Sequence, residues 1–126
     1  MHWFSFGIAS LAAAGIIGIG VMYLFQPRVM THNFGLPLPE EGRNTAWWLR
    51  LKGSRDVVSG MVVLAMMIWG SAFLLGIILL IEAIIPAGDM SLIVAAKGST
   101  KTALGVHGLT AALMIAAAIP LLLGVA

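Results

Sequence analysis

The stretch MMIWGSAFLL, residues 66–75, determines how the chain is divided into helices. It lies inside an apolar run that continues, with few interruptions, from Ala46 to Ala96. As one helix this run would be about 75 Å long, whereas the hydrocarbon core of a bilayer is about 30 Å thick. Trp69 favours the membrane interface and Gly70-Ser71 favours a tight reversal. The sequence therefore predicts two membrane-spanning helices, at about 46–69 and 72–94.

Two further apolar segments flank this pair, at about residues 4–25 and 102–123. A signal peptide is the competing interpretation of the first, but the residues before it contain no Lys or Arg and the apolar run exceeds a normal signal core. We therefore expect this segment to be retained as a spanning helix. The connections between the helices are short, so residues 1–126 are predicted to form a single all-α domain, an antiparallel four-helix transmembrane bundle.

The composition agrees with a bilayer environment and excludes several classes of protein. Of the 126 residues 60% are hydrophobic and 10% charged, and the mean hydropathy is +1.04. Soluble domains are about 25% charged. The chain has no cysteine, which excludes disulfides, thiolate metal sites and a cysteine nucleophile. Seven Lys and Arg against five Asp and Glu form no basic stripe, so nucleic acid is not an expected partner.

The basic residues indicate the orientation. In the four-helix arrangement they all lie at or near the face that carries the first and third connections: Arg28, Arg43, Arg50, Lys52, Arg55, Lys97 and Lys101. The positive-inside rule makes this face cytoplasmic and places both termini outside. We expect the chain to reside in a bacterial inner membrane in this orientation.

The first connection, Val29 to Thr45, is predicted to be a loop because turn-forming residues recur in it. Its apolar residues Phe34, Leu36 and Leu38 are expected at the membrane interface. Small residues are expected to let the helices approach closely. They are Gly15, Gly18 and Gly20 in the first helix, Ser59 and Gly60 in the second, and Gly105, Gly108, Ala112 and Ala116 in the fourth.

Ionisable residues from three helices are expected at a similar depth on the cytoplasmic side. Arg55 and Asp56 come from the second helix, Asp89 from the third and His107 from the fourth. A charge at the bilayer centre costs at least about 2.5 kcal/mol, so these groups should face the bundle interior and converge there. We predict them as the catalytic group, with Asp89 and His107 as the pair that carries the proton.

Three more polar residues are predicted to bind substrate near this group: Glu82, Lys52 and Tyr23. Lys52 and Asp56 share one helical face, and Glu82 lies two turns before Asp89 on another. Pro86 deprives the carbonyl of Glu82 of its helical donor, so a kink is expected between the two carboxyls. These features predict a polar pocket that opens toward the cytoplasmic side.

The function predicted from this pocket is acid-base catalysis, such as isomerisation, cyclisation or hydrolysis, on a lipophilic small molecule that enters from the bilayer. A proton-coupled transporter with Glu82 and Asp89 as a relay is the alternative, as is an accessory subunit in which the charges are paired for structural reasons. Snorkelling alone would also explain Lys52. No metal or other cofactor is expected, because His2, His32 and His107 are far apart in the sequence. The sequence is also compatible with a homo-oligomer.

Four short motifs resemble a known group of proteins. They are Phe34-Gly35-Leu36-Pro37, Lys52-Gly53-Ser54-Arg55-Asp56, Pro86-Ala87-Gly88-Asp89 and Gly105-Val106-His107-Gly108. In this order they resemble the small four-helix integral membrane proteins of unknown function near the DoxX-like proteins. The resemblance covers almost the whole chain. It implies the four-helix fold and names no reaction.

Overall fold

The computed structural model describes residues 2–125, which form helices and connecting turns and contain no strand. Three long helices are α1 (His2–Phe25), α3 (Thr45–Trp69) and α4 (Ala72–Ala95). A fourth consists of α5 (Thr100–Thr102), a π-helical segment η1 (Ala103–Gly108) and α6 (Leu109–Leu122) in direct succession. The ends of all four lie within two residues of the ranges expected from the sequence. The all-helical fold class is confirmed.

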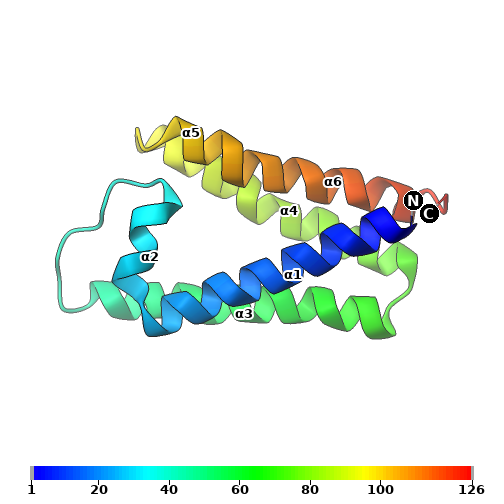
Figure 1. The fold of residues 1–126 in the computed structure, drawn as a ribbon, viewed down its shortest axis with the longest axis horizontal. Helices are drawn as coiled ribbons and strands as arrows, with labels where there is room; N and C mark the ends of the chain where they lie inside the picture. The colour runs from blue at the N-terminus through cyan, green and yellow to red at the C-terminus, as the bar shows by residue number, and fades with distance from the viewer. Residues whose placement is uncertain (1, 126) are drawn as a thin grey trace.

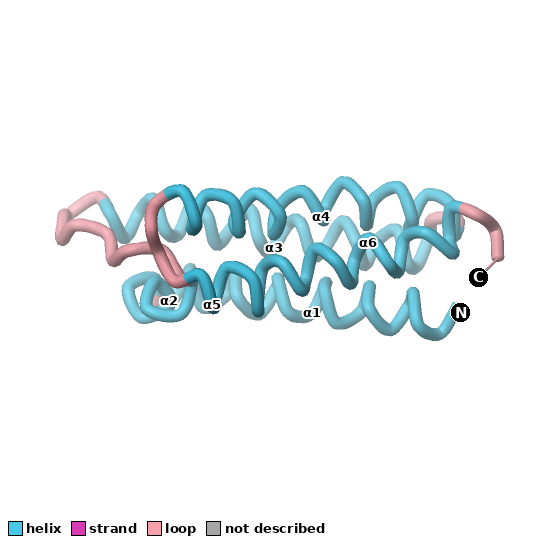
Figure 2. Tube along the Cα trace, turned by 90° about the horizontal axis from the view of Figure 1, so that it is seen from above, coloured by secondary structure: helices cyan, strands magenta, loops and turns pink. Residues whose placement is uncertain are grey.

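The long helices form two pairs. α1 packs mainly against α3, and α4 packs mainly against α6. Both ends of the described chain lie at one end of the molecule, and consecutive long helices run in opposite directions (Figure 1). The pairs approach each other at this end and separate toward the other (Figure 1). In a second view all four helices follow the long axis of the molecule (Figure 2).

The buried core lies in the half of the molecule where the pairs approach each other. It consists of small and aliphatic side chains from all four long helices: Ala9, Ala13, Val63, Leu75, Leu79, Ala83, Met114, Ala117, Ala118 and Leu121. Because each side chain is in contact with others from neighbouring helices, this half is closed by apolar packing.

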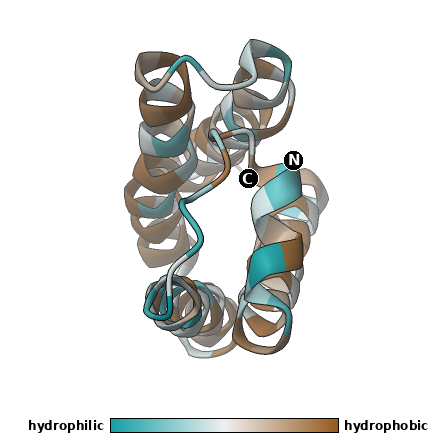
Figure 3. Ribbon diagram, turned by 90° about the vertical axis from the view of Figure 1, so that its left-hand side faces the viewer, coloured by the Kyte–Doolittle hydropathy of each residue, from teal (hydrophilic) through white to brown (hydrophobic). Residues whose placement is uncertain are grey.

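Large apolar side chains also cover the outside of the molecule. Leu92 is 64% exposed, Ile84 68% and Leu109 55%, and hydrophobic residues extend along the long helices in Figure 3. Within residues 2–125, three helical segments are long and apolar enough to cross a membrane, namely α1, α4 and the continuous helix Thr100–Leu122. A helical protein with such an exterior belongs in a bilayer.

α1 and α3 are in backbone contact through glycine. A Cβ atom on Gly53 would lie 2.6 Å from the carbonyl oxygen of Gly20, and one on Gly20 would lie 2.6 Å from that of Gly53. The expected role of Gly20 and Gly60 in close packing is confirmed, since both face atoms of the opposite helix. The same expectation is wrong for three glycines at which an added Cβ atom would have no neighbouring atom within 4 Å, namely Gly15, Gly18 and Gly105.

This contact gives a first testable prediction. Gly53→Ala should destabilise the protein by about 1–3 kcal/mol, because the new methyl group meets backbone that cannot rotate away. Gly18→Ala introduces the same methyl group on α1 into open space and serves as the control. Thermal unfolding in detergent should show a lowered midpoint for Gly53→Ala only. Equal midpoints for the two variants would contradict the close approach of α1 and α3.

The prediction of a loop from Val29 is wrong in its first part, because a short helix, α2 (Pro27–Phe34), follows α1 directly. Pro27 ends α1 and also begins α2, since a proline at the first helical position needs no hydrogen-bond donor. Gly35 ends α2 with a φ of 105°, a conformation that glycine adopts readily. The Gly35 carbonyl accepts from the Ser99 backbone amide at 2.8 Å, which ties α2 to the turn before α5.

Candidate functional site

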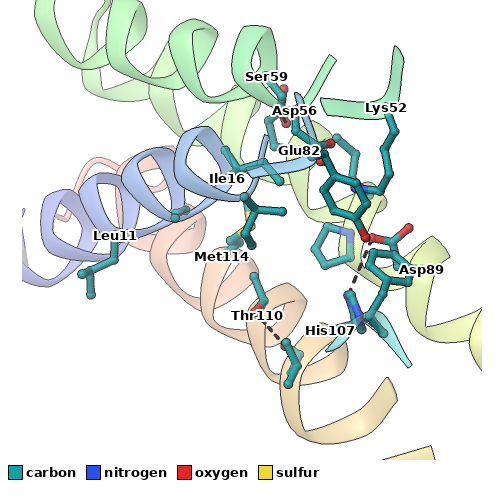
Figure 4. Close-up of a pocket in the computed structure, with 18 of the residues that line it drawn as sticks. Leu11, Ile16, Lys52, Asp56, Ser59, Glu82, Asp89, His107, Thr110 and Met114 are labelled. Carbon is teal, nitrogen blue, oxygen red and sulfur yellow. Dashed lines mark hydrogen bonds and ion pairs between the residues drawn. The ribbon is translucent and has the colours of Figure 1, made fainter. Parts of the chain in front are cut away.

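A cavity of about 430 Å³ lies where the two helix pairs separate. Its walls come from α1, α3, α4 and the last helix, and α2 contributes Met30, Asn33 and Phe34 at one end. Polar side chains gather in one part of the cavity and apolar side chains, among them Leu11 and Met114, in another (Figure 4). A volume of this size falls within the range of small-molecule sites in proteins.

Asp89 and His107 lie next to each other in the lining of this cavity. His107 Nδ1 lies 3.6 Å from Asp89 Oδ2 (Figure 4). The side chain of His107 is 12% exposed and that of Asp89 27% exposed. The structure therefore brings this predicted pair together from η1 and α4, at a distance suited to an ion pair that a small movement converts into a hydrogen bond.

The second nitrogen of His107 fixes the position of its ring proton. Nε2 lies 2.9 Å from the backbone oxygen of Phe34, and the Phe34 ring packs against the imidazole with centroids 4.7 Å apart. A carbonyl oxygen only accepts hydrogen bonds, so Nε2 must carry a proton. Nδ1, which faces Asp89, is then the nitrogen that can take up or release a proton without breaking the contact with α2.

The backbone around His107 is irregular. Residues Ala103–Gly108 form a π-helical turn within the last helix, a local widening that often marks functional sites. The sequence predicts an irregularity at Pro86 instead. α4 continues through Pro86, which lines the cavity, whereas the π-helical turn of η1 was not anticipated.

Lys52 and Asp56 form a second ion pair on the α3 wall. Their Nζ and Oδ2 atoms are 2.6 Å apart, one helical turn along the same face. The ammonium group also lies over the rings of Tyr23 at 4.4 Å and Phe34 at 5.1 Å, at cation–π distance. These aromatic contacts hold Lys52 inward at the cavity, so snorkelling toward water does not describe its position.

Glu82 lines the cavity nearer the middle of α4, where it accepts a hydrogen bond from the hydroxyl group of Ser59. Ser59 was expected only as a small packing residue, and its role as a partner of Glu82 was not predicted. The spacing from Asp56 offered a signal, since Ser59 follows it by three residues and so lies on the same face of α3.

Arg55 does not join this group. It is exposed on α3 and lies outside the residues that line the cavity, and within residues 2–125 it forms no ion pair. The expectation that Arg55 converges with Asp56, Asp89 and His107 is therefore wrong in its geometry. Arg55 lies about 100° around α3 from Asp56, and at its exposed position it points away from the cavity.

Of the remaining expected residues, Tyr23 is buried and lines the cavity beside Lys52. Phe34, expected at the interface, also lines it through α2. The cavity thus brings together Tyr23, Lys52, Asp56, Glu82, Asp89 and His107, which are six of the seven side chains singled out from the sequence.

Fold and cavity together define a small, apolar, all-helical protein of the membrane type with ionisable groups between its helices. The chain belongs to the family described as a domain of unknown function, DUF4267, whose model matches residues 13–122. No curated protein and no solved structure matches the chain. The expected membership of a family of unknown function is confirmed, and the likeness to the DoxX-like proteins stays a prediction.

Proposed function

We propose that all four long helices cross the membrane as an antiparallel bundle, with both termini outside a bacterial inner membrane. α3 supports this proposal although it carries Lys52, Arg55 and Asp56. Lys52 and Asp56 neutralise each other, and Val58 and Met61 on the outer face of α3 are each 57% exposed, as lipid-facing side chains would be. The basic residues near α2 and the turn before α5 favour the cytoplasm for that end.

Cysteine labelling tests this orientation, because the chain has no cysteine of its own. Thr100→Cys and Val125→Cys place one thiol at each end of the molecule, both at exposed positions. A membrane-impermeant maleimide added to intact cells should label Val125→Cys at once and Thr100→Cys only after the membrane is permeabilised. The reverse pattern would overturn the orientation, and labelling of both in intact cells would overturn the spanning arrangement.

We propose further that the protein is an enzyme that transfers protons on a lipophilic substrate. The observation that carries this proposal is the Asp89–His107 pair, 3.6 Å apart in a cavity with apolar walls. A carboxyl group and an imidazole in such a place can act as base and acid on one bound molecule. Lys52 has ammonium donors beyond the one that Asp56 accepts, and these can bind a substrate oxygen.

The proton balance of the pair favours isomerisation or cyclisation. In the ion-pair form Asp89 is a carboxylate and His107 carries protons on both nitrogens. The carboxylate takes a proton from one substrate atom while Nδ1 gives its proton to another. Asp89 is then a neutral acid and His107 a neutral imidazole, and transfer of the proton from Asp89 to Nδ1 restores the starting state. The cycle needs no net proton from solvent, but the O–H and N–H protons of the pair exchange with water between turnovers, since the side chain of Asp89 is 27% exposed.

The apolar core counts against the alternative of proton-coupled transport. Such a transporter needs access from both membrane faces. Beyond the cavity, toward the chain ends, the four long helices are closed by packed side chains such as Leu75, Leu79 and Leu121, each at most 2% exposed. An accessory subunit without chemistry is disfavoured by the cavity itself, because pairing for structural reasons alone does not require an open volume beside the charges.

Solvent isotope labelling tests the proposal without knowledge of the substrate. Purified protein in vesicles is incubated in deuterated water with a lipid extract of its native membrane. Proton transfer at carbon should place deuterium on at least one lipophilic component, and mass spectrometry would detect this against vesicles without protein. If every component labels equally with and without protein, the enzymatic proposal fails.

A further inference from the structure

The cavity is elongated along the helix axes, and its two ends differ in polarity. On α1 its lining runs from Tyr23 at the end near α2 to Leu11 near the middle of the molecule, about 18 Å at 1.5 Å per residue. The ion pairs lie at the α2 end, whereas Leu11, Ile16 and Met114 line the other end (Figure 4). A ligand that fills both parts must have a polar group at one end and an apolar chain at the other.

The ionisable groups at the polar end already have partners within the protein. Lys52 lies beside Asp56, His107 beside Asp89, and Glu82 accepts from Ser59. Among the described residues that line the cavity, carboxyl groups outnumber basic side chains. An anionic head group would therefore meet no free cation and would lie next to carboxylates, which is costly in an apolar environment. An uncharged head that donates and accepts hydrogen bonds fits these partners without disturbing either ion pair.

The apolar part of the cavity opens sideways between α1 and the last helix. Leu11 and Ile19 on α1 and Val106 on η1 line the cavity and are also exposed, at 72%, 40% and 55%. α1 and the last helix separate on this side toward α2 (Figure 1). Because these residues belong to segments that face the bilayer, the opening leads into lipid.

Gly15 lies in this opening. It lines the cavity, and a Cβ atom placed on it would have no neighbour within 4 Å. Close helix packing therefore does not explain a glycine here. Gly18 on the same helix is equally free of neighbours but does not line the cavity.

We propose that the cavity binds a single-chain amphiphile with an uncharged hydroxyl-type or carbonyl-type head, the head beside Asp89 and His107 and the chain beside Gly15. Because Gly15 has no side chain, the cavity has space at this point for the apolar chain of the ligand. Gly15 is therefore a specificity-determining residue. The inference rests on the proposed function, which selects this cavity as the site. It concerns only the binding of the amphiphile and does not require that the protein converts it.

Photo-crosslinking tests the inference with defined probes. Dodecanol that carries a diazirine near the chain end is added to the protein in vesicles. The sample is then irradiated and the labelled peptides are mapped. We expect labelling of α1 near Gly15 and of α6 near Met114, which excess unlabelled dodecanol abolishes. The matched dodecanoate probe at alkaline pH should bind at least about tenfold more weakly. Labelling that excess alcohol does not reduce, or equal binding of the carboxylate, would overturn the inference.

Two glycine variants supply the matched comparison. Gly15→Phe should reduce the saturable labelling at least about fivefold, whereas Gly18→Phe, which places the same side chain outside the cavity, should leave it unchanged. Circular dichroism and thermal unfolding verify that both variants fold, and the comparison of alcohol with carboxylate needs only the wild-type chain. Undiminished labelling of folded Gly15→Phe would refute the role of Gly15. Turnover in the isotope assay together with failed labelling would reject this inference and leave the enzymatic proposal intact.

Discussion

Asp89→Asn is expected to abolish deuterium transfer to the substrate while the melting temperature of the protein stays close to the wild-type value. The amide keeps the shape of the side chain but cannot take up a proton, and loss of a general base costs about 10²- to 10⁴-fold in rate. Stability should change little, because Asp89 is 27% exposed and its 3.6 Å contact with His107 is longer than a hydrogen bond. The measurement pairs the isotope assay with thermal unfolding of the same preparation.

Ser91→Ala is the control for this variant. Ser91 lies two residues further along α4, is exposed, and its hydroxyl group donates only to the Ala87 carbonyl of its own helix. We expect full activity and unchanged stability from it. A large drop in melting temperature for Asp89→Asn, with Ser91→Ala unaffected, would identify the Asp89–His107 pair as structural and withdraw its catalytic role.

Lys52→Met is expected to produce the largest loss of stability among substitutions in the cavity. It leaves the carboxylate of Asp56, which is 8% exposed, without its partner at 2.6 Å. Breaking a buried ion pair costs about 3–5 kcal/mol, and we expect the lower end of this range because the Lys52 side chain is 32% exposed. Unfolding by denaturing detergent in mixed micelles would measure the change.

Arg55→Met is the matched control, since it removes the same charge from the same helix at an exposed position outside the cavity. Its effect should stay within about 0.5 kcal/mol. The double variant Lys52→Met with Asp56→Leu should regain much of the stability lost by Lys52→Met, because the unpaired carboxylate is then gone. A stable Lys52→Met single variant would contradict the importance of the pair.

The long helices could be predicted from the sequence because each is a continuous apolar run that ends at an identifiable residue. Trp69-Gly70-Ser71 separates α3 from α4, and Pro27 ends α1. The prediction missed a second role of Pro27. A proline at the first position of a helix is favourable, so Pro27 begins α2 as well as ending α1.

The candidate site could be predicted in part, because depth in the membrane follows from position along a helix. Depth alone selected Asp89 and His107, which line the cavity, but it also selected Arg55, which is exposed outside the cavity. Helical periodicity would have added Ser59, whereas the exclusion of Arg55 depends on how α3 is rotated against its neighbours. The contact of His107 with the Phe34 carbonyl joins residues far apart in the chain, and nothing in the local sequence of either predicts it.

A crystal structure of the protein grown from a lipid phase at neutral pH would test the proposed lipophilic site without a prior choice of ligand. We expect elongated density in the cavity, with its polar end in hydrogen-bond contact with Asp89 or His107 and its chain directed toward Leu11 and Met114. A continuous file of water molecules that passes Glu82 and reaches the end of the molecule near the chain termini would refute the site, because the cavity would then be a path across the membrane.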